Sequence, residues 1–114
     1  MKTAKRKRLE ANGWKIGTAK EFLGLSDEEE RLIAIRLSLS RALAEKRKKA
    51  AYSQERLAKL IGSSQSRVAK MEAGDSSVSI DLLVRALLSM GSPIEELSRI
   101  LRRAKPKHRV LHHA

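Results

Sequence analysis

The stretch SQERLAKLIGSSQSRVAKMEAG, residues 53–74, carries polar residues that a hydrophobic core does not need. A glutamine amide can pair with adenine, a serine hydroxyl with several bases, and a lysine or arginine with guanine or phosphate. A glutamine at a helix N-terminus can also combine its amide with the free backbone N–H groups there to hold a phosphate. The residue types therefore suit contacts with DNA, and the side chains concerned are those of Gln54, Ser64, Gln65, Ser66, Arg67 and Lys70.

The local sequence predicts that these residues lie on two short helices. Ser53 is suited to cap the first helix, and Gly62 permits a tight reversal of the chain. Ser64 is then expected to cap a second helix over residues 65–73, which Gly74 ends in the left-handed conformation.

Apolar residues on both short helices predict how they pack. Leu57 and Ile61 of the first helix and Val68 and Met71 of the second should face the core, while Ala58 allows another helix to approach closely. Two helices joined by a turn of three or four residues that contains glycine form a helix-turn-helix. The second helix of such a motif can enter the major groove of DNA.

A long helix is expected over residues 27–49, upstream of this motif. Ser26 and Glu29 form a capping box, and the acidic first turn suits the positive end of the helix dipole. The helix has two apolar stripes, one made of Leu32, Ile35, Leu39, Ala42 and Leu43, the other of Ile33, Leu37 and Ala44. One compact domain can cover the first stripe. We expect the N-terminal extension, with Trp14, Ile16, Phe22 and Leu23, or a partner chain to cover the second.

Two more helices follow the motif. The first begins at Ser79 and is apolar nearly all round, so it should form the buried centre of the domain. In GSPIEEL, Ser92 is expected to cap the last helix, with Pro93 at its first position and Glu95 completing a capping box. The prediction is an all-α domain of five helices.

The bulk composition favours an anionic partner. The chain of 114 residues has a formal net charge of +12, which favours association with polyanions rather than any particular fold. It has no cysteine, which excludes a disulfide framework and a thiolate zinc site. No stretch is apolar enough for a signal peptide or a membrane span, so we expect a cytoplasmic protein.

The helix-turn-helix resembles that of the Cro/C1-type, or XRE, family of bacterial and phage regulators, which have a lambda-repressor-like fold. The matching residues are Gln54, Leu57, Ala58, Gly62, Ser64, Gln65, Ser66, Val68, Met71, Glu72 and Gly74, and the similarity covers about residues 30–102. Ser63 departs from the pattern, because the family often has an apolar residue there. The resemblance implies base contacts by Gln65, Ser66 and Lys70, and backbone contacts by Gln54 and Arg67. Ser64 is also expected to contact the DNA backbone.

The segment GWKIGTAKEFLGLSDEEERLIAIRLSLSRAL is also similar to the leader of HigA-type antitoxins. Such proteins bind a RelE-superfamily toxin, an mRNA-cleaving ribonuclease, and repress their own operon as dimers. The resemblance implies operator DNA, a second copy of the chain and a toxin as partners. Two alternatives stay open: a solitary regulator of the same family without a toxin, and a basic adaptor or RNA-binding module.

The rest of the sequence predicts no enzyme, no cofactor and no metal site. His108, His112 and His113 lie in a basic tail that has no carboxylate and no core to hold a metal. The acidic run at 27–30 is explained by the start of a helix, and no nucleotide-binding or nucleophile motif occurs. We expect three regions: a basic arm and extension over 1–25, the DNA-binding domain over 26–104, and a basic tail over 105–114.

Overall fold

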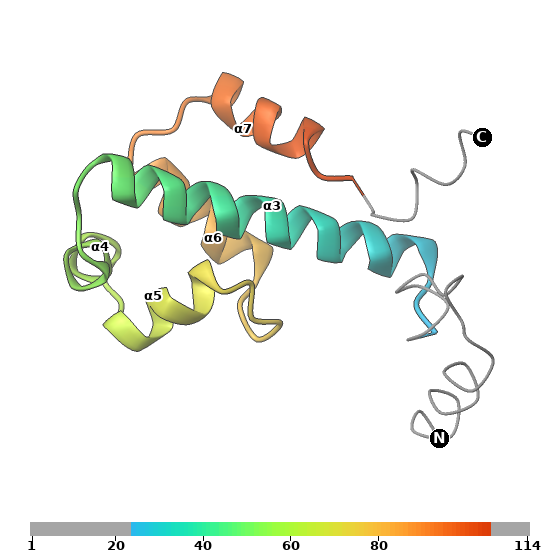
Figure 1. The fold of residues 1–114 in the computed structure, drawn as a ribbon, viewed down its shortest axis with the longest axis horizontal. Helices are drawn as coiled ribbons and strands as arrows, with labels where there is room; N and C mark the ends of the chain where they lie inside the picture. The colour runs from blue at the N-terminus through green and yellow to red at the C-terminus, as the bar shows by residue number, and fades with distance from the viewer. Residues whose placement is uncertain (1–23, 106–114) are drawn as a thin grey trace. The chain divides into compact units, whose positions relative to one another are not determined.

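The computed structural model describes residues 24–105 and contains five α-helices over that range, with no strand (Figure 1). The helices are α3 (Asp27–Lys49), α4 (Gln54–Ile61), α5 (Gln65–Glu72), α6 (Ile80–Ser89) and α7 (Ile94–Arg102). The predicted five-helix, all-α fold is therefore confirmed. None of the helices described is long and apolar enough to cross a membrane. The expected roles of Trp14, Ile16, Phe22, Leu23 and the three histidines lie outside the described residues.

The helix starts follow the predicted caps. The N–H of Ser26 donates to Glu29 Oε1 at 2.9 Å, and the N–H of Glu29 donates to Ser26 Oγ at 3.1 Å, which completes the capping box. The hydroxyls of Ser53, Ser64 and Ser79 each accept an N–H three residues later. Each cap satisfies a donor that a helix N-terminus would otherwise leave without a partner.

The start of α7 differs from the prediction. Pro93 is the N-cap residue, and neither Ser92 nor Glu95 forms the expected capping box. The hydroxyl of Ser92 instead donates to Glu96 Oε2 at 2.7 Å, and the ammonium of Lys46 lies 3.1 Å from Glu96 Oε1. The ammonium of Lys46 thus holds the Glu96 carboxylate beside Ser92. The Ser92 hydroxyl donates to this charged acceptor and does not accept a backbone N–H, as a helix cap would.

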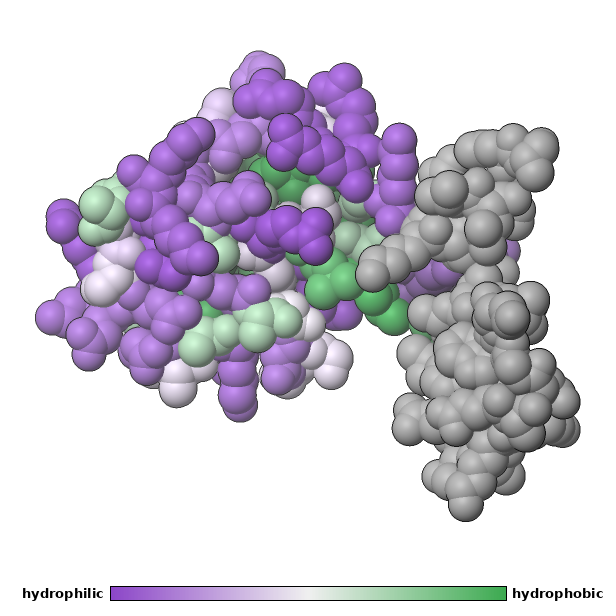
Figure 2. Space-filling model, in the orientation of Figure 1, coloured by the Kyte–Doolittle hydropathy of each residue, from purple (hydrophilic) through white to green (hydrophobic). Residues whose placement is uncertain are grey.

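The core lies among all five helices. Its buried apolar residues are Leu39, Leu43, Leu57, Ala58, Val68, Met71, Val78, Leu83, Ala86, Leu87 and Ile100. On α3 the packed part of the first stripe begins at Ile35, so the expectation that Leu32 joins the core is wrong: its side chain is 48% exposed. The second stripe leaves Ile33 and Leu37 exposed. Figure 2 shows hydrophilic residues over most of one face, with smaller apolar areas between them.

Helix α6 is buried on one side only. Leu83, Ala86 and Leu87 are buried, whereas Leu88 is 48% exposed. The expectation that α6 is buried all round is therefore correct for a single face.

Helix α3 holds the C-terminal part of the domain through polar contacts. Its Ser38 hydroxyl donates to the carbonyl oxygen of Ile100 at 2.9 Å, near the end of α7, and its Lys46 contacts Glu96 near the start. Helix α7 therefore runs antiparallel along α3, on the side opposite to α5 in Figure 1. Arg36 of α3 donates to the carbonyl oxygen of Val78 at 3.1 Å, which fixes the loop before α6. These contacts belong to the compact unit of residues 34–104.

Candidate DNA-binding surface

Helices α4 and α5 are joined by a three-residue turn. Gly62 ends α4 in the left-handed conformation, with φ 67 and ψ 41, which glycine adopts without strain. The N–H of Ser63 then donates to the carbonyl oxygen of Ala58 at 2.7 Å. Ser64 begins α5 as its N-cap. The turn therefore fixes the angle at which α5 leaves α4, as the glycine spacing predicted.

Helix α5 has an apolar face and a polar face. Val68 and Met71 are fully buried, so the predicted inward pair is confirmed. The side chains proposed to touch DNA on this segment, Ser64, Gln65, Ser66, Arg67 and Lys70, are all exposed. Arg67 and Lys70 form no ion pair with any residue in the described part of the chain, so both charges are available to an anion.

Gln54 and Gln65 form a hydrogen-bonded pair. Gln65 Nε2 donates to Gln54 Oε1 at 2.7 Å, and Gln54 Nε2 donates to Glu72 Oε1 at 3.0 Å. A glutamine amide offers two N–H donors and one carbonyl oxygen. Gln65 therefore keeps one donor and its acceptor, which is the combination that the N7 and N6 positions of adenine require.

A buried ion pair supports this glutamine pair. Arg47 of α3 donates through Nε and Nη2 to the two carboxylate oxygens of Glu72, the second at 3.0 Å. Its Nη1 donates to the carbonyl oxygen of Tyr52 at 2.8 Å. The hydrogen bonds to the Glu72 carboxylate raise the pKa of Arg47 above its ordinary value. The network joins the end of α3, the start of α4 and the end of α5, so it holds Gln54 in place.

Sequence reasoning selected Gln54 and Gln65 as DNA contacts, which stay predictions, but missed the hydrogen bond between them and the ion pair that supports it; Gln65 is exposed and Gln54 is half-buried. A usable signal was present. Arg47 lies four residues after Leu43, and Glu72 lies four residues after Val68, so each charged residue continues an inward face. Opposite charges at such positions on two packed helices indicate a buried ion pair.

The two serines at the start of α5 are close together. The Oγ atoms of Ser64 and Ser66 are 3.3 Å apart, and Ser64 Oγ accepts the N–H of Arg67 at 3.2 Å. Ser64 thus acts first as a helix cap, and the hydroxyl of Ser66 lies beside the helix N-terminus, where backbone N–H groups favour anions.

The comparisons with known proteins agree with this geometry. A family model described as helix-turn-helix matches residues 43–97, from the last turns of α3 to the start of α7. This segment is therefore similar to helix-turn-helix domains of the Cro/C1 type. The domain indicates a DNA-binding transcriptional regulator, a class whose members are generally not enzymes. No curated protein and no solved structure gives a match.

Proposed function

We propose that the protein is a sequence-specific transcriptional repressor that inserts α5 into the major groove of its operator. The observation that carries this proposal is the Gln54–Gln65 pair. It holds Gln65 at the exposed first turn of α5 with a free donor and acceptor, anchored through Glu72 to the core. A side chain oriented before binding loses less conformational entropy when it pairs with a base.

The proposal assigns different roles to the exposed residues. Gln65, Ser66 and Lys70 read base edges, whereas Gln54, Ser64 and Arg67 hold the phosphate backbone. Gln65→Ala should then cost about 1–3 kcal/mol at the cognate site and relax one base position, with little change on random DNA. Equal losses on both DNAs would refute the base-reading role of Gln65.

Lys70→Ala gives a matched comparison on the same helix. If Lys70 contacts a base, its removal should lower the preference of the protein for the cognate site over random DNA. If instead the slope of log K against log salt falls by about 0.9 with specificity unchanged, Lys70 contacts a phosphate.

We further propose that the protein binds as a homodimer. A dimer of helix-turn-helix domains requires an inverted repeat with half-sites about 34–36 Å apart. Selection of bound sequences from a random duplex library at about 150 mM salt, where exposed charges are screened beyond roughly 8 Å, tests this arrangement. Enrichment of an inverted repeat is the expected result. Measurable binding without any enrichment would favour the basic adaptor or RNA-binding module.

The finer proposal is that the protein is the antitoxin of a toxin–antitoxin pair. The HigA-like leader supports it, and so do Ile33 and Leu37, whose side chains on α3 are 37% and 42% exposed and need a cover. The test is co-expression with a toxin-like reading frame beside the gene, with toxin-dependent mRNA cleavage and complex formation as readouts. We expect the full chain to suppress cleavage and a variant lacking residues 1–25 to fail. The absence of such a reading frame would favour a solitary regulator.

The regions flanking the domain complete the proposal. We infer that residues 26–104 carry DNA recognition, whereas the basic segments 1–25 and 105–114 add contacts to phosphate. Deletion of either segment should then reduce the salt dependence of operator binding and leave the selected sequence unchanged.

A further inference from the structure

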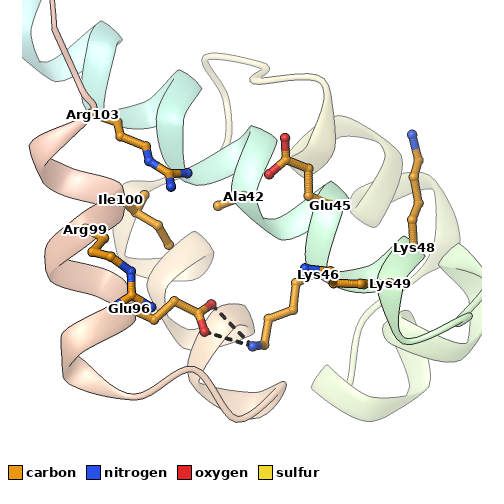
Figure 3. Close-up of a pocket in the computed structure, with 9 residues that line it drawn as sticks. All are labelled: Ala42, Glu45, Lys46, Lys48, Lys49, Glu96, Arg99, Ile100 and Arg103. Carbon is orange, nitrogen blue, oxygen red and sulfur yellow. Dashed lines mark hydrogen bonds and ion pairs between the residues drawn. The ribbon is translucent and has the colours of Figure 1, made fainter.

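A second surface, independent of α5, lies between α3 and α7. The two helices border a hollow of about 700 Å³, which we name the α3–α7 groove (Figure 3). Its lining comes from Ala42, Glu45, Lys46, Lys48 and Lys49 of α3, and from Glu96, Arg99, Ile100 and Arg103 at α7 and its C-cap. Ala42, which is half-buried, provides a small apolar floor, whereas Ile100 is only 4% exposed and belongs mainly to the core.

The groove has an excess of positive charge. Its lining contains five cationic side chains and two carboxylates. Lys46 is paired with Glu96 at 3.1 Å, and the guanidinium of Arg99 lies on the same side of the groove (Figure 3). Lys49 and Arg103 are exposed and form no ion pair with a described residue. The surface therefore attracts anions and has charge left to pair.

The position of the groove separates it from the DNA-binding surface. Helix α7 lies along α3 on the side opposite to α5 in Figure 1. A duplex held by α5 would leave the groove open, because one helix of the domain stands between them. An occupant of the groove can therefore bind at the same time as DNA.

We propose that the α3–α7 groove binds an acidic segment of a partner protein. A small apolar side chain of the segment would rest on Ala42, and its carboxylates would pair with Lys49 on one rim and Arg103 on the other. The volume lies within the range of sites that hold drug-sized ligands, so it admits a few side chains. Glu45 also lines the groove and would repel the regularly spaced phosphates of a nucleic acid. A peptide can instead place one carboxylate at each rim and uncharged side chains near Ala42 and Glu45, so the lining favours a peptide.

The test uses the ¹⁵N-labelled full chain and a capped peptide, EELAEELEE, with its QQLAQQLQQ counterpart as the uncharged control. We expect saturable shifts in the amide signals of Ala42 and Ile100 with the acidic peptide only. Arg103→Glu should weaken binding roughly tenfold, because it replaces one rim attraction with a repulsion. Arg102→Glu is the matched control: it makes the same charge change at the neighbouring exposed residue, which does not line the groove, and should alter the affinity less than twofold.

Lys49→Glu tests the opposite rim and should lower the affinity for the acidic peptide by a similar factor. Operator binding by all three variants confirms that they fold. The proposal is overturned if Arg102→Glu lowers the peptide affinity as much as Arg103→Glu does, since binding would then depend on the net charge of the protein and not on the groove. It is also overturned if a single-stranded oligonucleotide shifts the same signals and loses affinity in the same two rim variants. Because operator binding is measured separately, a failure here leaves the proposed repressor function standing.

Discussion

The buried pair of Arg47 and Glu72 gives the sharpest test of how the recognition helix is held. Their side chains are only 12% and 8% exposed. Removing one partner therefore leaves the other charge largely buried, with a single hydrogen bond to a neutral group: Arg47 to the Tyr52 carbonyl, or Gln54 to Glu72. Such a change typically costs about 3–5 kcal/mol, and a domain of this size has a stability of only about 5 kcal/mol. We therefore expect Arg47→Met and Glu72→Leu each to remove at least half of the stability.

The double variant separates the ion pair from general packing. With both charges gone, Met and Leu can pack against each other, and well-packed apolar replacements of buried ion pairs are often neutral. We expect the double variant to lose less stability than either single variant. Urea denaturation followed by circular dichroism measures all three, and the cycle gives the coupling between the two residues.

An exposed ion pair in the same domain provides the control. Arg85 and Asp81 are i, i+4 partners on α6 at 3.0 Å, each with a side chain that is 74% exposed. Arg85→Met should cost less than about 0.5 kcal/mol. If Arg47→Met costs no more than this control, or if the double variant loses the sum of the two single losses, the argument for a buried, coupled pair is refuted.

Two further predictions concern a turn and a carboxylate. Gly74 has φ +73, and an added Cβ would lie 2.7 Å from Cδ2 of Leu37, an exposed side chain that can turn away. Gly74→Ala should therefore destabilise the domain by about 1–2 kcal/mol, which is the cost of the left-handed conformation alone. Gly62→Ala, at φ +67 with open space around it, should cost about the same in the same denaturation assay, and a clearly larger loss at Gly74 would show that Leu37 cannot move away. The hydrogen bond from Ser92 lowers the pKa of Glu96. The ionised Glu96 therefore contributes its full stabilisation above the ordinary pKa of a carboxyl group, and this stabilisation is lost as the pH falls through the lowered pKa. Ser92→Ala should raise the pKa of Glu96 in a ¹³C NMR titration and reduce the loss of stability in acid, and an unchanged pKa would contradict the assigned cause.

Local signals in the sequence predicted most of the fold. Serine caps and glycine terminators act within one turn of a helix, so the sequence alone located both helices of the motif and its turn. The prediction failed at the start of α7, because the partner of Glu96 is Lys46, 50 residues earlier in the chain. No local pattern contains such a contact.

The hydrogen bonds of the candidate site escaped prediction for the same reason. Gln54 and Gln65 were chosen by residue type and position; Gln65 is exposed, Gln54 is half-buried, and their contacts with DNA stay predictions. Their mutual hydrogen bond depends on the angle between α4 and α5, and the anchoring of Gln54 depends on where Glu72 and Arg47 meet. These are properties of packed helices, so they could be recognised only once the helices were in place.

The hydrogen-bonding of the polar face also bears on how such a protein could change its operator in evolution. Ser66 and Lys70 are exposed and have no bond to the core, so substitutions there alter the surface shown to DNA without disturbing the fold. Gln65 is bonded to Gln54, which is bonded in turn to the buried carboxylate of Glu72. New specificities are therefore accessible by single substitutions at positions 66 and 70, whereas position 65 is expected to change together with position 54.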